Sequence, residues 1–510
     1  MYCNQEISLL RKQGEPEKAI EKAKDCLKRN PEDLWVRKAV SWAYYDLAKK
    51  AKENNNFDDF IRQIDEILEL NLPENESMIR ENVSKLINGW IFNWAKNKHY
   101  PWDKINQLLK RTQKLELPKP GEAYSYVLKA YLKIFKENPL KSVEFIDWWD
   151  LKNLRIGDFE QPVFEGGKKG ISLAERAYIT YAKSLLNNTN LFSEKARDLL
   201  QTLDELIKKH PDMKYMPYYK AKILLELGNK KAFLENFIPF LKKNRNTFWV
   251  WDLLAEATEN PEQKLSYLSK SILLNKSIDH SVKTRRNIIP LLINKGLYDA
   301  AKTEVLNVLE TYKKNNWKIP RELILWQNER WFHQAKRQKS NIYLYNNLAE
   351  SADNIFFENI KPEKILVTYV NKDKNLISFL KGKPDNLEAG FFPYNPKINS
   401  VNKHDILEVK LQNKSGSNFY QARILRTVSP EEPFSLRKNF EGKLRLHYKG
   451  FGFVDNVFIP SFLIQHTSLQ NGQQVKGTAV LSYDMKKKKY GWSAIECKVA
   501  LNDDDCIFPF

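Results

Sequence analysis

The spacing of apolar residues divides the chain into a long helical part and a shorter part made of strands. From the N-terminus to about residue 335, apolar positions recur three and four residues apart, in segments separated by short turns rich in Gly, Pro or Asn. This period is typical of amphipathic helices. From residue 364 the period changes to two, in short runs rich in Val, Ile, Phe and Tyr. The pattern therefore predicts paired helices followed by a β region.

The helical part contains a recurrent spacing between a turn glycine and two residues that pack. In three segments, glycine stands five and nine positions before small or apolar residues. Small residues let the two helices of a hairpin approach closely, and a proline such as Pro31 ends the second helix. The three sets are Gly14, Ala19 and Ala23; Gly228, Phe233 and Phe237; and Gly296, Ala301 and Val305.

This spacing resembles that of tetratricopeptide repeats. The resemblance implies an α-solenoid of helical hairpins over residues 5–335, with a concave groove that holds a protein or peptide. The alternative is that the helices only support the C-terminal part. The second unit departs from the repeat, because Ala51–Asp59 predicts an insertion before its second helix.

One segment of the helical part predicts neither a helix nor a short turn. Residues 154–176 are rich in Gly, Pro and charge, and they are long for a connection between helices. They form either a loop that lies in the groove, anchored by Phe159 and Phe164, or a hinge between two helical halves.

The order of these segments predicts an α+β multidomain protein. About ten short strand-like runs follow the helices, and two five-stranded OB-type β-barrels are the simplest arrangement for them. The predicted domains are a helical N-terminal half (1–150), a second helical half (151–335) with the loop 154–176, a connecting helix (336–360), a first barrel (361–430), a second barrel (431–500) and a tail (501–510).

The second barrel contains a concentration of phenylalanine and glycine in the stretch KGFGFVDNVFIPSF, residues 449–462. Successive strand residues point to opposite faces, so the phenylalanines face outward if the valines and the isoleucine fill the barrel. The side chains predicted to face outward are Phe451, Phe453 and Phe458.

Basic residues lie on the same predicted face. In the preceding strand, inward-pointing leucines leave Lys443, Arg445 and His447 on the aromatic side, and Lys449 comes just before the first ring. Bases stack on aromatic rings, and Lys or Arg binds phosphates. Exposed rings edged with positive charge therefore predict a surface for single-stranded nucleic acid.

The same stretch resembles the cold-shock-like OB domains. The match consists of residues 449–454 and 457–459, the two ribonucleoprotein-type motifs of that family, and of residues 469–480, which enter the fourth strand. With VFIPS in place of the VFVHF of bacterial cold-shock proteins, it is more similar to the cold-shock-like domains of the RNase II group and of the transcription terminator Rho. The resemblance covers residues 441–500 and implies that the three phenylalanines stack bases, although Leu446 stands where cold-shock proteins have a stacking Trp.

The first barrel contains a fainter copy of these motifs. Its run LISFLKG aligns with GFGFV, and GFFPY aligns with VFIPS. The alignment predicts outward positions for Phe379 and Phe391, which would extend the nucleic-acid surface.

The formal net charge of +20 favours a polyanionic partner, because clustered Lys and Arg attract phosphates. The alternative is an evenly basic surface that reflects a composition rich in Lys and Asn throughout. The run Lys486–Lys489 predicts the tip of a hairpin between the last two strands, either as a solvated turn or as an extension of the phosphate track.

Several classes of protein are disfavoured by the sequence. It has neither an apolar run of bilayer length nor a secretory signal at its start, so we expect a cytoplasmic protein without a membrane partner. The four cysteines, Cys3, Cys26, Cys497 and Cys506, are predicted to be free thiols. Nucleotide-binding, hydrolase and zinc-protease motifs are missing, so we expect no enzyme activity, no cofactor and no metal site, with Asp503–Asp505 as a solvated tail.

Together these features predict a non-enzymatic nucleic-acid-binding adaptor that uses the solenoid as a protein-interaction scaffold. Its preferred partner is single-stranded RNA, with single-stranded DNA left open, because rings stack the bases of either. Two alternatives stay open. One is a protein scaffold whose OB barrels bind a protein partner. The other is the targeting subunit of a nucleic-acid-processing or bacterial conflict complex that acts on single-stranded DNA.

Overall fold

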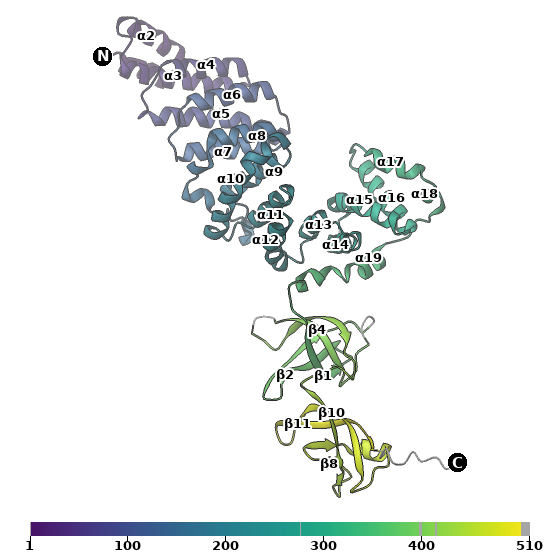
Figure 1. Ribbon diagram of the computed structural model, residues 1–510. Helices are drawn as coiled ribbons and strands as arrows, with labels where there is room; N and C mark the ends of the chain where they lie inside the picture. Colours follow the sequence, from purple (N-terminus) through teal and green to yellow (C-terminus); the bar gives the residue numbers. More distant parts are fainter. Residues whose placement is uncertain (1, 276, 397–399, 414–415, 501–510) are drawn as a thin grey trace. The chain divides into compact units, whose positions relative to one another are not determined.

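The computed structural model describes residues 2–275, 277–396, 400–413 and 416–500 (Figure 1). Helices form the chain up to residue 357, and strands follow from residue 363, as the change of apolar period predicts. The chain divides into two compact units near Asn260 and Pro261. The first unit is helical, and the second contains further helices and two β-sheets.

The first unit is a stack of helical hairpins, which confirms the predicted solenoid. Neighbouring helices bury apolar residues against each other, so that cores run along the stack. The helices are α1 (Cys3–Lys12), α2 (Pro16–Arg29), α3 (Leu34–Glu53), α4 (Phe57–Glu69), α5 (Ser77–Asn97), α6 (Trp102–Lys114), α7 (Glu122–Phe135), α8 (Pro139–Trp149), α9 (Leu173–Leu186), α10 (Thr189–Lys209), α11 (Met216–Glu226), α12 (Lys230–Lys243) and α13 (Phe248–Ala257), with 3₁₀ turns η1 (Leu151–Asn153), η2 (Ile156–Phe159) and η3 (Glu165–Gly167).

The three predicted turn glycines all adopt the left-handed conformation. Their φ angles are +82° at Gly14, +73° at Gly228 and +71° at Gly296, a region that glycine enters without a steric penalty. In each case the residues five and nine positions later are fully buried, as the spacing predicts. These buried residues are Ala19, Ala23, Phe233, Phe237, Ala301 and Val305.

The predicted insertion at Ala51–Asp59 is wrong. Helix α3 runs to Glu53 and α4 begins at Phe57, so only a short turn joins them. Asn55 takes the place of the turn glycine, with φ +55°, because asparagine is the next most tolerant residue in this conformation. Phe60, five positions later, is fully buried. The second hairpin therefore follows the same spacing as the others.

The prediction of free thiols is wrong for two of the four cysteines. Cys3 of α1 and Cys26 of α2 form a disulfide across the first hairpin, with a Cα–Cα distance of 6.6 Å. The packing of the two helices brings the side chains together despite a separation of 23 residues. Cys497 is a buried free thiol, and Cys506 lies outside the described residues.

The segment 154–176 forms a loop that is fixed to the helices at Asp158. The buried carboxylate of Asp158 accepts hydrogen bonds from Ser125 Oγ of α7 (2.6 Å) and from the backbone N–H of Arg155 (2.9 Å). Phe159 anchors the loop as predicted, because its ring stacks on that of His210, 4.2 Å away. Phe164 does not, because it is exposed.

The single connecting helix predicted at the end of the helical part is two shorter helices in the structure. The helices of the second unit are α14 (Pro261–Leu274), α15 (Ile278–Asn294), α16 (Tyr298–Lys314), α17 (Arg321–Asn328), α18 (Arg330–Gln334), α19 (Ile342–Ala349) and the 3₁₀ helix η4 (Ala352–Phe357). Residues 336–360 thus form α19 and η4 in place of a single helix.

A buried polar network joins α19 to α15 and α16. The carboxylate of Glu304, 1% exposed, accepts hydrogen bonds from Arg285 Nη1 (2.7 Å), Tyr345 Oη (2.8 Å) and Asn341 Nδ2 (2.9 Å). Burial and the neighbouring Glu304 raise the pKa of Tyr345 well above its ordinary value, so this hydroxyl stays a donor. The network fixes the end of the helical part by satisfying a charge that has no access to water.

The two sheets are barrel-like and OB-type, as predicted. The first has the order β3-β2-β1-β4-β5, and a parallel bridge from Phe391 to Phe419 joins its edges. The second has the order β6-β10-β11-β9-β8-β7. The strands are β1 (Glu363–Asn371), β2 (Leu376–Lys383), β3 (Asn386–Pro393), β4 (Ile406–Asn413), β5 (Tyr420–Thr427), β6 (Arg437–Lys443), β7 (Arg445–Leu446), β8 (Gly452–Val454), β9 (Val457–Ile459), β10 (Gln474–Asp484) and β11 (Lys489–Val499), with helix α20 (Ser461–His466) between β9 and β10.

The second sheet has six strands where five were predicted. Leu444 separates β6 from β7. Its side chain is buried, and its N–H donates to Gln473 O (2.9 Å), so the chain turns toward the barrel interior at this residue. A single long run in the sequence is therefore two short strands in the structure.

The two barrels share a hydrophobic cluster, which we call the inter-barrel core. It joins strands of the first barrel to β10 of the second through the segment that connects them. Its buried members are Leu366, Leu380, Ile406, Val428, Leu436, Val480 and Leu481. Ser435 Oγ also donates to Gly382 O, 2.6 Å away. The barrels are therefore packed on each other.

Candidate nucleic-acid interface

A short hairpin presents two of the predicted stacking rings side by side. Strands β8 and β9 are antiparallel, and Phe453 is paired directly with Phe458. The connecting turn places Asp455 at φ +48°. Val454, Val457 and Ile459 are buried, whereas both phenylalanines are half-buried and reach the surface. The predicted direction of these side chains is confirmed.

Phe451 completes a triad of rings in mutual contact. Its centroid lies 5.8 Å from that of Phe453 and 5.5 Å from that of Phe458, and the latter two are 5.7 Å apart. Rings at these distances support one another in offset or edge-to-face contacts. The triad forms a firm apolar surface on the outside of the barrel.

Two further rings extend the triad through the turn between β7 and β8. The imidazole of His447 stacks on Phe451 at 4.3 Å, and Tyr448 lies 4.3 Å from His447. Tyr448 is 87% exposed, and Gly450 adopts φ +83° in the turn. We call these five residues, Phe451, Phe453, Phe458, His447 and Tyr448, the aromatic platform.

Tyr448 was missed by the sequence analysis. Strand alternation assigns sides only to residues inside a strand, and Tyr448 lies in a turn closed by the hydrogen bond from Gly450 N–H to His447 O (2.9 Å). The signal available in the sequence was the turn glycine two residues after it, which marks a loop tip.

Two of the predicted cations, Arg445 and Lys449, lie beside the platform, and all three keep their charge available. Lys443, Arg445 and Lys449 are exposed, and none of them forms an ion pair with any residue that the structure describes. Arg445 is paired in register with Phe453, and Lys449 Nζ lies over the ring of Tyr448, 5.5 Å from its centroid. Positive charge therefore lies directly beside the rings.

The first barrel does not repeat this surface, and the outward position predicted for Phe379 is wrong. Phe379 is 1% exposed and packs in the barrel core against Phe392 and Tyr420. The alignment was displaced by one residue, which exchanges the two faces of a strand. Ser378 occupies the outward position, opposite Phe391. Phe391 is 38% exposed, as predicted.

The lysine run forms the predicted hairpin tip. Asp484 Oδ1 accepts hydrogen bonds from the backbone N–H groups of Lys486 (2.9 Å) and Lys487 (3.1 Å), and these bonds lower the pKa of Asp484. The side chains of Lys486–Lys489 are exposed. Tyr483 and Tyr490, paired at the base of this tip, have ring centroids 5.1 Å apart.

The helical part contains a separate groove of about 650 Å³. Helices α5, α7 and α9 line it, and residues of the loop 154–176 form one wall. Its lining combines carboxylates such as Glu81 and Glu122 with the cations Lys85, Lys129 and Arg176. A groove with mixed charge suits a peptide better than a polyanion.

The described residues form neither a cluster of metal ligands nor a helix of the kind that crosses a membrane. Within the described part of the chain, no three His, Cys, Asp or Glu side chains gather as a metal site. Asp503–Asp505 lie outside that part. None of the helices that the structure describes is both long and apolar enough to cross a membrane.

Two family models match parts of the chain. Residues 438–497 match the S1/CSD-like domain 2 of the TOTE conflict systems. Residues 214–352 match a domain of unknown function, DUF7017. A search of curated proteins finds no match to this chain.

Solved structures resemble the chain only weakly. One, titled MamA RS-1 ArsTM double mutant, is 13% identical, with 39% of this chain and 99% of that chain covered and a TM-score of 0.26. The Naa15/Naa10 complex bound to HypK-THB is 15% identical, with coverages of 69% and 53% and a TM-score of 0.25. The human IFIT1 dimer with m7Gppp-AAAA is 11% identical, with coverages of 67% and 68% and a TM-score of 0.26. TM-scores this low do not establish a shared fold.

The platform and its cations lie within the matched residues 438–497. The second barrel is thus similar to the S1/CSD-like domain 2 of the TOTE conflict systems, a similarity that favours nucleic-acid binding.

Proposed function

We propose that this protein is a non-enzymatic adaptor that binds single-stranded RNA on the aromatic platform and a protein or peptide in its helical groove. The observation that carries the nucleic-acid part is the triad of half-buried phenylalanines, with ring centroids 5.5 to 5.8 Å apart, beside the exposed cations Arg445 and Lys449. Stacking is worth about 1 to 3 kcal/mol per base, and the cations bind the phosphates between the bases.

The preference for RNA rests on the resemblance of the VFIPS motif to the cold-shock-like domains of the RNase II group and of Rho. Flat rings stack the bases of RNA and DNA equally well, so the preference depends on contacts to the 2′-hydroxyl. The polar residues beside the platform, such as Arg445 and Lys449, are the groups that would make them.

The peptide part of the proposal rests on the groove between α5, α7 and α9. Its volume and its alternating charges suit an extended or helical segment with charges of both signs. This groove lies in the first unit, whereas the platform lies in the second, so one chain offers two binding surfaces.

A second candidate function is favoured by the match to the TOTE conflict systems. In this version the barrels target a nucleic-acid-processing conflict complex to single-stranded DNA, and a separate chain carries the enzyme. The same platform serves both versions, so competition between RNA and DNA oligonucleotides of equal sequence separates them.

The proposal is tested by replacing Phe451, Phe453 and Phe458 with alanine together and titrating a labelled single-stranded oligonucleotide. We expect the affinity to fall by at least a hundredfold, because two or more bases lose their stacking partners. Phe164→Ala, at an exposed phenylalanine of the helical part, is the matched control. A thermal melt of each variant checks the fold, and an unchanged affinity in the triple variant would refute the proposal.

A further inference from the structure

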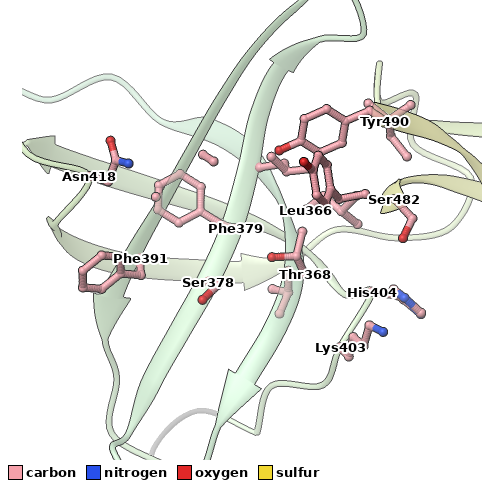
Figure 2. Close-up of a pocket in the computed structure, with 16 residues that line it drawn as sticks. Leu366, Thr368, Ser378, Phe379, Phe391, Lys403, His404, Asn418, Ser482 and Tyr490 are labelled. Carbon is pink, nitrogen blue, oxygen red and sulfur yellow. The ribbon is translucent and has the colours of Figure 1, made fainter. Parts of the chain in front are cut away.

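Both barrels contribute to a pocket of about 400 Å³ that lies beside the inter-barrel core. Strands β1, β2 and β3 of the first barrel line it, together with the loop before β4. The second barrel adds Leu481, Ser482, Tyr483 and Tyr490 from β10 and β11. Figure 2 shows Phe391 and Asn418 on one side of the view and Tyr490 and Ser482, on the yellow strands, on the other.

The lining combines flat rings with short polar side chains. Phe391, Tyr483 and Tyr490 are each between about one third and one half exposed, so their rings face open space. Hydroxyl and amide groups lie among them, on Thr368, Ser378, Ser482 and Asn418. A nucleobase needs a ring to stack on and donors and acceptors for its edges, and this lining supplies both.

The charge of the lining suits an anion. It contains Lys403 and His404, and none of its residues is Asp or Glu. Lys403 is exposed and forms no ion pair with a described residue. By contrast, another pocket of the second barrel contains Glu441 and Glu496. A phosphate in the inter-barrel pocket therefore meets Lys403 and no carboxylate from the lining itself.

Strand β11 links the pocket to the aromatic platform. This strand pairs in parallel with β9, and Ser493 is in register with Phe458 of the platform. Tyr490 lies three residues before Ser493, which is about 10 Å at the rise of a β-strand. Gly491 lies between them, and a Cβ atom at this position would meet nothing within 4 Å. The odd separation places the side chains of Tyr490 and Ser493 on opposite faces of β11. Because β9 pairs with β11 only at Trp492 and Ser493, a nucleic-acid strand that leaves Phe458 reaches Tyr490 by passing the edge of β11 at Gly491.

We propose that the inter-barrel pocket holds a nucleotide of the same single strand that stacks on the platform, with its base against Tyr490 and Tyr483 and its phosphate beside Lys403. This inference rests on the proposed function and deepens it. OB folds take about 4 to 16 nucleotides, so a second contact at Tyr490, three residues along β11 from the position beside Phe458, falls within one bound strand. The first barrel thereby joins the binding surface through this pocket, whose lining includes Ser378 and Phe391 from its outward strand face.

The test uses the full-length protein and fluorescent oligouridines of 3 to 12 nucleotides, titrated by anisotropy. The variants are Tyr490→Ala and Lys403→Gln. The matched controls are Tyr343→Ala and Lys372→Gln, at an exposed tyrosine and an exposed lysine outside the pocket. Lys403→Gln changes a solvent-exposed side chain, so it keeps the test valid if Tyr490→Ala lowers the melting temperature.

We expect the affinity of the wild-type protein to rise with length beyond the shortest oligouridines. Tyr490→Ala and Lys403→Gln should each remove about tenfold of that gain, and they should leave the shortest oligouridines and both controls unchanged. If short oligouridines bind but the gain with length is the same in every variant, the pocket inference is overturned and the platform stands. If no oligouridine binds the wild-type protein, the proposed function fails as well.

Discussion

The imidazole of His447 lies almost parallel to the ring of Phe451, with centroids 4.3 Å apart and planes inclined by 10°. The turn itself holds this pair, because the N–H of His447 donates to the carbonyl of Phe451 at 2.7 Å. One face of Phe451 is therefore already covered. A base arriving at this end of the platform meets His447 or the exposed ring of Tyr448.

Replacing His447 with alanine should lower the affinity for a single-stranded oligonucleotide by about tenfold, because one stacked ring is lost. His447→Phe should restore most of the affinity, since a phenyl ring retains the flat surface. Fluorescence anisotropy at fixed salt measures both. An alanine variant that binds like the wild-type protein would contradict a role of this ring.

Removing the three cations around the platform should weaken binding in a salt-dependent way. For the variant Lys443→Gln, Arg445→Gln, Lys449→Gln, the slope of log K against log salt should become shallower by about 2, at about 0.7 per lost phosphate contact on a single strand. Titrations at several salt concentrations measure this slope. The control Lys372→Gln, in the first barrel, should leave it unchanged. Equal slopes in all three proteins would show that these cations do not contact phosphates.

Glu304→Ala should destabilise the helices of the second unit by about 3 to 5 kcal/mol, because it leaves the partly buried guanidinium of Arg285 without its partner. The control lies on the same helix. Glu310 pairs with Arg337 at the surface, and Glu310→Ala should cost less than about 1 kcal/mol. Urea unfolding followed by circular dichroism gives both values. Similar losses in the two variants would mean that the buried network adds little.

Gly228→Ala should destabilise its hairpin by about 1 kcal/mol, although nothing lies within 4 Å of the new Cβ atom. The cost is purely conformational, because φ is +73°. Gly491→Ala is the control, since its surroundings are equally open and its φ is not in the left-handed region. Thermal melts compare the two, and a melt of Gly228→Ala at the wild-type temperature would contradict the left-handed turn.

The stability of the barrel pair should depend on Glu432 at acidic pH. A hydrogen bond from Arg426, with help from the backbone N–H of Ser429 and from Lys364, lowers the pKa of Glu432 to about 2. The usual value is about 4.3, so the folded state gains from the charged form above that pH and loses this gain as the pH falls toward 2.

Glu432→Gln should therefore unfold at a lower urea concentration than the wild-type protein at pH 7, and the difference should shrink as the pH falls from about 4.3 toward 2. Tryptophan fluorescence, to which Trp492 beside the inter-barrel core contributes, follows the transition. A difference that persists unchanged at low pH would exclude this carboxylate as its source.

The faces of the second barrel were predictable from sequence because β8 and β9 alternate strictly. Val454 is buried and Phe453 reaches the surface. In β9, Val457 and Ile459 are buried and Phe458 between them reaches the surface, so the alternation is repeated. Strand β2 gives no such signal. Ile377 and Phe379 fill the barrel, while Leu380 on the other side belongs to the inter-barrel core. Apolar residues therefore lie on both faces of β2, and Ser378 is the one polar residue between Leu376 and Leu380, so periodicity gives only a weak signal for the register of this strand.

Two other differences between the sequence-based predictions and the structure lie in turns. Asn55 adopts the left-handed conformation that glycine adopts in the other hairpin turns, so a sequence pattern that requires glycine misses this turn. Tyr448 lies in a loop tip, where alternation assigns no direction. The disulfide between Cys3 and Cys26 depends on how two helices pack, which a separation of 23 residues does not reveal.

Val480 and Leu481 illustrate why the two barrels are not independent folding units. Both side chains are buried against the first barrel and its connecting segment, so a fragment that begins at residue 431 would place them in water. Truncation studies should therefore keep residues 361–500 together. A destabilising mutation in the first barrel should therefore also affect the aromatic platform of the second barrel, although the mutated residue makes no contact with it.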